Sequence, residues 1–101
     1  MVKYHKRNEF RKNKKSGHPA YIFEKVGNEF VFLGLTHSSI TRGVKNIRLE
    51  RSPNPDETKT VFIRPMSEKL RSNKFSKQPY KNWSFTKSDQ KKIDKIKKRT
   101  K

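Results

Sequence analysis

The chain has 101 residues with a formal net charge of +18 at pH 7, because lysine and arginine number 27 against nine acidic residues, and only 29% of its residues are hydrophobic. It contains no cysteine, which excludes disulfide bonds and thiolate metal ligands. No apolar run approaches the roughly 20 residues of a membrane span, and the start lacks the apolar segment of a secretory signal, so we expect a cytoplasmic protein that does not enter a membrane.

The first segment, residues 1–15, is basic and rich in asparagine. Its apolar residues, such as Tyr4 and Phe10, are too sparse to define a buried face. This predicts a flexible arm, or one that a partner orders. Residues 14–19 are then a linker that ends at Pro19, since the residue before a proline favours extended geometry.

Residues 20–36 are the clearest element of the chain. AYIFEKV and EFVFLGLT flank Gly27-Asn28, a dipeptide typical of a two-residue hairpin turn. If those two residues form the loop, the register runs back from the turn and places His18 beside His37 at one end of the sheet, although a slip of one residue would put them on opposite faces. Both faces are apolar near that end, so we expect it to be buried on both sides.

Further strands and one helix complete the predicted domain. The segments 45–51 and 59–64 alternate between apolar and polar residues and read as a second hairpin around a proline-rich loop. We expect one or two helical turns at 66–72. Residues 87–101 read as a basic helix, introduced by a capping box at 86–89 and stabilised by a narrow stripe of Ile93 and Ile96.

Together these elements predict a mainly β (α+β) fold, either a small SH3-like barrel or a twisted antiparallel sheet with a C-terminal helix. The organisation would be a basic arm over 1–15, a β domain over 16–86 and a basic helix over 87–101.

The sequence offers few groups for catalysis. The three histidines lack nearby carboxylate partners in sequence, and there is no HExxH motif or Cys/His cluster, so we expect neither a metal site nor a cofactor. Asp56-Glu57 is the only acidic cluster and reads as part of a surface loop. Metal-independent work on phosphodiesters is the chemistry that remains.

Polar side chains gather directly after the first hairpin, in LTHSSITRG at 35–43. Cleaving RNA without a metal requires groups that accept and deliver protons, and cations that stabilise the charge on the phosphorane. Histidine suits the first task at neutral pH, and arginine or lysine the second. The candidate catalytic residues are Thr36, His37, Ser38, Arg42 and His18. The alternative is a polar turn whose side chains bond to local backbone.

The charge itself indicates the partner. So large a positive charge repels itself in a compact chain unless a polyanion offsets it, and nucleic acid is the obvious polyanion. An anionic membrane or an acidic protein is the alternative, as is a lysine-rich surface with no nucleic-acid role. Trp83 belongs to an aromatic and basic segment that could stack bases, although such aromatics more often cover a small core. The candidate contacts to RNA or DNA are Lys14, Lys15, Lys25, Arg48, Arg64, Lys81, Trp83, Lys91, Lys95 and Lys98.

The stretch HPAYIFEKVGNEFVFLGLTHS at 18–38 resembles the opening of the PemK/MazF-type growth-inhibiting toxins, and the resemblance extends over residues 16–65. In that family a Pro-led strand precedes a strand that ends in a Thr-Ser pair. Thr36 matches the family's hydroxyl, and Ser38 is displaced by one position because His37 intervenes. The family usually carries an arginine and a glycine before the first strand, where this chain has Lys15 and Gly17. This departure leaves Lys15, Lys25 and Arg42 as candidates for the catalytic cation.

The resemblance implies an SH3-like barrel, metal-independent cleavage of single-stranded RNA, and neutralisation by an antitoxin, whether protein or RNA. The alternative is a non-enzymatic RNA- or DNA-binding protein, such as a ribosome-associated or mobile-element accessory protein. In that alternative the segments 1–15 and 87–101 contact phosphates.

Overall fold

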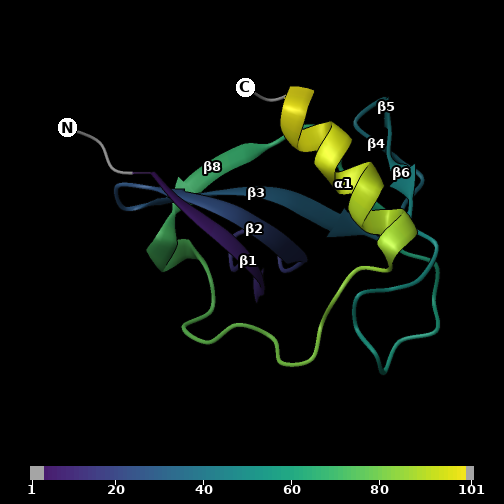
Figure 1. The fold of residues 1–101 in the computed structure, drawn as a ribbon, viewed down its shortest axis with the longest axis horizontal. Helices are drawn as coiled ribbons and strands as arrows, with labels where there is room; N and C mark the ends of the chain where they lie inside the picture. The colour runs from purple at the N-terminus through teal and green to yellow at the C-terminus, as the bar shows by residue number, and fades with distance from the viewer. Residues whose placement is uncertain (1–3, 100–101) are drawn as a thin grey trace.

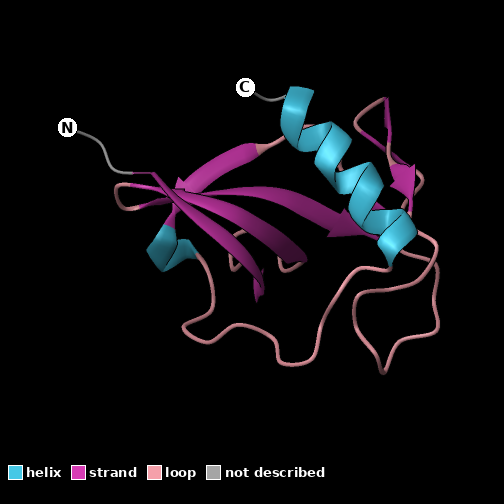
Figure 2. Cartoon of the chain, viewed as in Figure 1, coloured by secondary structure: helices cyan, strands magenta, loops and turns pink. Residues whose placement is uncertain are grey.

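The protein is an antiparallel sheet with one C-terminal helix, which confirms the mainly β prediction (Figures 1 and 2). The computed structural model describes residues 4–99. The elements are β1 (Tyr4–Lys12), β2 (Pro19–Val26), β3 (Glu29–Thr36), β4 (Ile40–Thr41), β5 (Val44–Lys45), β6 (Ile47–Arg48), β7 (Phe62–Ile63), β8 (Glu68–Arg71), the 3-10 helix η1 (Ser72–Lys74) and α1 (Lys87–Arg99).

Strand β3 is the centre of a six-stranded sheet in which five strands follow the order β1-β2-β3-β7-β6 and the sixth, β8, pairs with β3. One edge of β3 pairs with β2, and its other edge is shared by β8 near the start and β7 near the end. Strands β4 and β5 form a separate two-stranded hairpin. Within residues 4–99 no strand pairing joins β6 back to β1, so the pairing fits the open, twisted-sheet form of the prediction.

Strand β1 corrects the prediction of a flexible arm over 1–15. It runs antiparallel to β2 from Tyr4↔Val26 to Lys12↔Pro19. One large side chain anchors it, because the ring of Phe10 is buried with its centroid 5.1 Å from that of Tyr21. The expected linker at 14–19 is instead the turn between β1 and β2. Residues 1–3 of the predicted arm lie outside the described residues.

The β2–β3 hairpin has the predicted turn at Gly27-Asn28, and Gly27 adopts the left-handed φ of +60° that such a turn requires. The predicted register holds from Val26↔Glu29 to Glu24↔Val31 and then shifts by one residue. Beyond the shift Ile22 pairs with Phe32, which leaves residue 23 as the extra residue of a β-bulge. Continued along the strands, this register places residue 18 opposite residue 36, so the predicted pairing of 18 with 37 is wrong by one position.

The hairpin is buried on both faces, as its apolar pattern predicts. One face carries a cluster that includes Tyr21 and Leu33, and the buried Ile93 and Ile96 of α1 complete it. Helix α1 therefore covers this face, and Figure 1 shows it lying across the sheet. The other face carries Ala20, Ile22, Phe30 and Phe32 against the buried Phe75, which follows η1.

Of two further predictions, the helical turn at 66–72 is wrong and the pairing of segments 45–51 and 59–64 is confirmed. Residues 68–71 form strand β8 against β3, with Leu70 opposite Phe30, and do not form the expected helical turn. The segments 45–51 and 59–64 do pair antiparallel, with Ile47 opposite Ile63, although the paired strands β6 and β7 are only two residues long.

Helix α1 begins as predicted, because the Asp89 backbone N–H donates to Thr86 Oγ1 at 3.1 Å. The Asp89 carboxylate is fully buried and accepts the backbone N–H groups of Glu50 at 2.8 Å and Arg51 at 3.2 Å, so it ties the helix to the chain after β6. Residues 100–101 of the predicted helix lie outside the described residues. Between residues 4 and 99 no helix has the length and apolar character needed to cross a bilayer.

Candidate functional site

A groove of about 560 Å³ lies at the end of the β2–β3 hairpin that is remote from the Gly27-Asn28 turn. Its walls come from the β1–β2 turn, the β4–β5 hairpin, the residue after β7 and strand β8. We call it the cationic groove. The charged residues that line it are Lys15, Arg42, Arg64, Lys69 and Glu68, four cations against one carboxylate.

Lys15 is held by a structured turn and not by a mobile linker. The buried Asn13 accepts the backbone N–H of Lys15 on its Oδ1 at 2.9 Å, and its own N–H donates to the carbonyl of His18 at 2.9 Å. Gly17 completes the turn with a φ of +79°. The sequence therefore brings Lys15 to the groove through the hairpin that β1 forms with β2.

Arg42 reaches the groove from the tip of the β4–β5 hairpin. Residues 42 and 43 are its two-residue loop, and both have positive φ values, +51° for Arg42 and +77° for Gly43. This is the type I′ pattern, whose first position favours asparagine, aspartate or glycine. An arginine there costs about 1 kcal/mol relative to those residues.

Arg64 is fixed between β3 and the β4–β5 hairpin. Its backbone N–H donates to the carbonyl of Gly34 at 2.8 Å, and a Cβ at position 34 would lie only 3.2 Å from Arg64 Cγ, so the glycine makes room for the arginine stem. Nη1 donates to the carbonyl of Thr41 at 3.2 Å and to Oδ1 of Asn46 at 3.0 Å. Nε and Nη2 have no partner in the described part of the chain, which leaves three N–H donors for an anion.

His18 and Thr36 also line the cationic groove. Thr36 is half-buried, and its Oγ1 accepts the backbone N–H of Ser38 at 3.2 Å. Its hydroxyl proton therefore points to no acceptor among the described residues and can be donated to a ligand. The His18 imidazole is exposed at the neighbouring strand end.

His37 and Ser38 do not line the groove. The Ser38 hydroxyl donates to the carbonyl of Ile40 at 2.5 Å, so for Ser38 the structure matches the alternative of a polar turn bonded to local backbone. His37 contacts a carboxylate instead: its Nε2 lies 3.1 Å from Glu57 Oε2, and the other carboxylate oxygen of Glu57 accepts the Ser52 hydroxyl at 2.8 Å.

A smaller pocket of about 260 Å³ adjoins the groove, and His37 lines it. We call it the aromatic pocket because Tyr80 and Trp83 form part of its wall. The residues common to both depressions are His18, Pro19, Leu35 and Thr36. His18 and His37 therefore both line the aromatic pocket, although the bulge shifts the predicted register between their strands.

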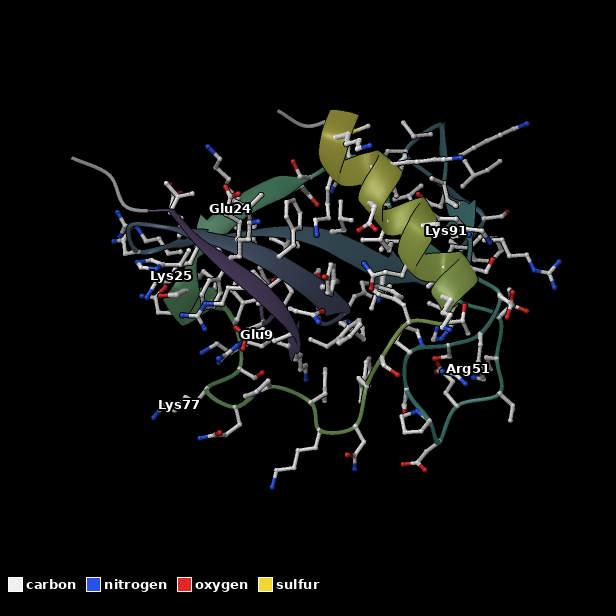
Figure 3. All side chains as sticks on the ribbon, in the orientation of Figure 1. Glu9, Glu24, Lys25, Arg51, Lys77 and Lys91 are labelled. Atoms are coloured by element: carbon white, nitrogen blue, oxygen red, sulfur yellow. The ribbon has the colours of Figure 1, made fainter. Side chains whose placement is uncertain are left out.

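Lys25 is not brought to this site. It pairs with Phe30 beside the Gly27-Asn28 turn. Seven residues of strand separate it from His18, which is about 23 Å. Figure 3 shows it at the end of the sheet remote from Arg51.

The other predicted contacts lie outside both depressions. Lys91, Lys95 and Lys98 are exposed on α1, which covers the face of the sheet opposite Phe32 and the cationic groove. Lys14, Arg48 and Lys81 are exposed elsewhere.

Trp83 is half-buried and packs on the core, as the alternative of a core lid predicts. Its ring is stacked on Tyr80, with centroids 4.2 Å apart and 10° between planes, and lies 5.6 Å from the ring of Phe10. Burial raises the pKa of Tyr80 above its ordinary value of 10.0.

The sequence does not predict the roles of several residues of the site. Lys69 lies in the segment expected to be helical, and Asn46 carries no local signal of its role as the anchor of Arg64. Glu57 is visible in the sequence as part of an acidic pair, but only the fold places it beside His37.

Comparisons with protein-family models, with curated proteins and with solved structures found no match to this chain. Over residues 4–99 the acidic and histidine side chains do not form a group of three that could hold a metal ion.

Proposed function

We propose that the protein is a toxin-like endoribonuclease of the cytoplasm that binds single-stranded RNA in the cationic groove and cleaves it without a metal ion. The observation that carries this proposal is the convergence of four cations, from four separate segments, on a groove that also holds His18 and Thr36. Successive phosphates of a strand in the groove meet the N–H donors of Arg64 and the ammonium groups of Lys15 and Lys69. These cations also stabilise the charge that develops on the phosphorane.

The two histidines supply proton transfer. The Glu57 carboxylate only accepts hydrogen bonds, so it holds the proton of His37 on Nε2 and leaves Nδ1 as the acceptor. His37 takes the proton of the ribose 2′-OH as the O2′–P bond forms. A protonated His18 gives its proton to the O5′ leaving oxygen as the P–O5′ bond breaks. The products are a 2′,3′-cyclic phosphate and a 5′-hydroxyl, and the Thr36 hydroxyl donates to a non-bridging oxygen throughout.

The chemistry favours RNA over DNA, because the attacking 2′-OH belongs to ribose alone. The resemblance of residues 16–65 to the PemK/MazF-type toxins supports the same activity. It also suggests that an antitoxin, protein or RNA, covers the groove in the resting cell.

The test is incubation of end-labelled single-stranded RNA with the protein in EDTA. We expect cleavage with cyclic phosphate ends, and a loss of at least about a hundredfold in rate for His37→Ala and for His18→Ala. Lys91→Ala, on the opposite face, serves as the matched control and retains the wild-type rate. Intact RNA at saturating protein would contradict the cleavage activity.

The second candidate is a non-enzymatic nucleic-acid binder of RNA or DNA, such as a ribosome-associated or mobile-element accessory protein. The exposed Lys91, Lys95 and Lys98 favour it, since they form a basic ridge on α1 that can follow a phosphate backbone. In this candidate the basic residues of segment 1–15 that the structure describes are carried by the paired strand β1 and not by a flexible arm. Salt-sensitive binding of RNA and DNA alike, without cleavage, would support this candidate.

A further inference from the structure

The aromatic pocket lies next to the cationic groove, because His18 and Thr36 line both. A ligand that crosses this boundary meets cations on one side and an aromatic wall on the other. A nucleotide has this composition, with its phosphate and its base joined through one sugar.

The wall of the pocket suits a flat, unpaired ring. Tyr80 and Trp83 form a parallel stack at its side, and Pro19 and Pro53 add apolar surface. Both aromatic rings are only half-buried, so the stack is not sealed by the core. Stacking of one base on such a side chain contributes about 1–3 kcal/mol.

The rim of the pocket offers both a donor and an acceptor to the edge of a base. Asn54 uses Oδ1 to accept the Asp56 N–H at 3.0 Å, while its Nδ2 has no partner among the residues that the structure describes. Glu57 retains lone pairs beyond its contacts with His37 and Ser52. Hydrogen bonding to either edge of a base is therefore available without disturbing the fold.

We propose that the aromatic pocket binds one unpaired nucleobase of the strand whose phosphate occupies the cationic groove. This inference rests on the proposed function, because the groove must bind the strand first. The base stacks on the Tyr80–Trp83 pair, and this contact positions the adjoining phosphodiester between His18 and His37.

Trp83 is the chain's only tryptophan, so its fluorescence reports directly on the pocket. The experiment titrates the protein with a short single-stranded RNA and with an abasic RNA of equal length, both 2′-O-methylated so that neither is cleaved, while anisotropy of a labelled competitor measures binding of each. We expect both oligomers to bind, the intact RNA about tenfold more tightly, and only the intact RNA to quench Trp83.

The variant Tyr80→Ala should lose the tenfold preference for intact RNA and leave the affinity for abasic RNA unchanged, whereas Tyr80→Phe should keep both. A folding defect would lower the affinities for intact and abasic RNA together. The ratio of these two affinities in one variant therefore distinguishes the loss of base stacking from a folding defect. Equal binding of intact and abasic RNA by the wild type, with unchanged fluorescence, would overturn the base pocket and leave the proposed groove intact. Failure of both oligomers to bind would overturn the proposed function as well.

Discussion

Removing one cation from the groove should change the salt dependence of RNA binding by a calculable amount. Four cations line the groove, and each phosphate contact with single-stranded RNA contributes about −0.7 to the slope of log K against log salt. The wild-type slope should therefore be about −3, and affinity should fall about 50-fold between about 50 and about 200 mM salt. Lys69→Ala should reduce the slope to about −2 and the loss to about 20-fold.

The assay is fluorescence anisotropy with a labelled RNA in EDTA, made non-cleavable by 2′-O-methylation so that binding alone is measured. Lys91→Ala is the matched control, since Lys91 is also exposed but lies on α1, as Figure 3 shows. Its slope should equal that of the wild type. If Lys91→Ala and Lys69→Ala lower the slope equally, the RNA contacts the whole basic surface and the groove has no special role.

Three further predictions concern stability. Asp89→Ala removes the acceptor of the Glu50 and Arg51 N–H groups and should lower the free energy of unfolding, measured by urea titration, by about 2–5 kcal/mol. The control Asp94→Ala, on the exposed side of α1, should change this free energy by less than about 0.5 kcal/mol. Arg42→Asn should raise the free energy of unfolding by about 0.5–1 kcal/mol, because asparagine tolerates the positive φ at this position better than arginine does. The same substitution should weaken RNA binding. A gain in stability without a loss of affinity would show that Arg42 does not contact the RNA. Because burial raises the pKa of Tyr21 above 10.0, the folded state holds its phenolic proton more tightly than the unfolded chain, so stability should fall as the pH rises above about 10. Tyr21→Phe should reduce this fall in alkaline denaturation, and Tyr80, whose pKa burial also raises, should account for part of the remainder.

The elements that the sequence predicts well are those that local rules decide. Gly27-Asn28 supplies the backbone conformation of its turn, and Thr86 supplies the acceptor that begins α1. The double-sided burial of the central hairpin follows from apolar residues on both faces. The Thr36–Ser38 contact also follows from a local preference, that of a polar turn for its own backbone.

The elements that the sequence misses depend on distant partners. Strand β1 has one strong apolar residue, Phe10, and becomes a strand because β2 offers an edge and Trp83 and Phe85 enclose that ring. Residues 68–71 have a helical pattern of their own, but the free edge of β3 pairs with them. Tertiary context overrides weak local preference in both segments.

By itself, then, the sequence determined the charge, the hairpin, the terminal helix and the presence of histidines near one end of a sheet, because each depends on residues close together in the chain. The tertiary structure alone decided which cations share a cavity. Arg64 reaches the groove through its contact with Asn46, and His37 gains Glu57 from a loop 20 residues away. A one-residue bulge sets the positions of His18 and Thr36, and no local rule fixes such a bulge, since it depends on how both faces of the hairpin pack at once.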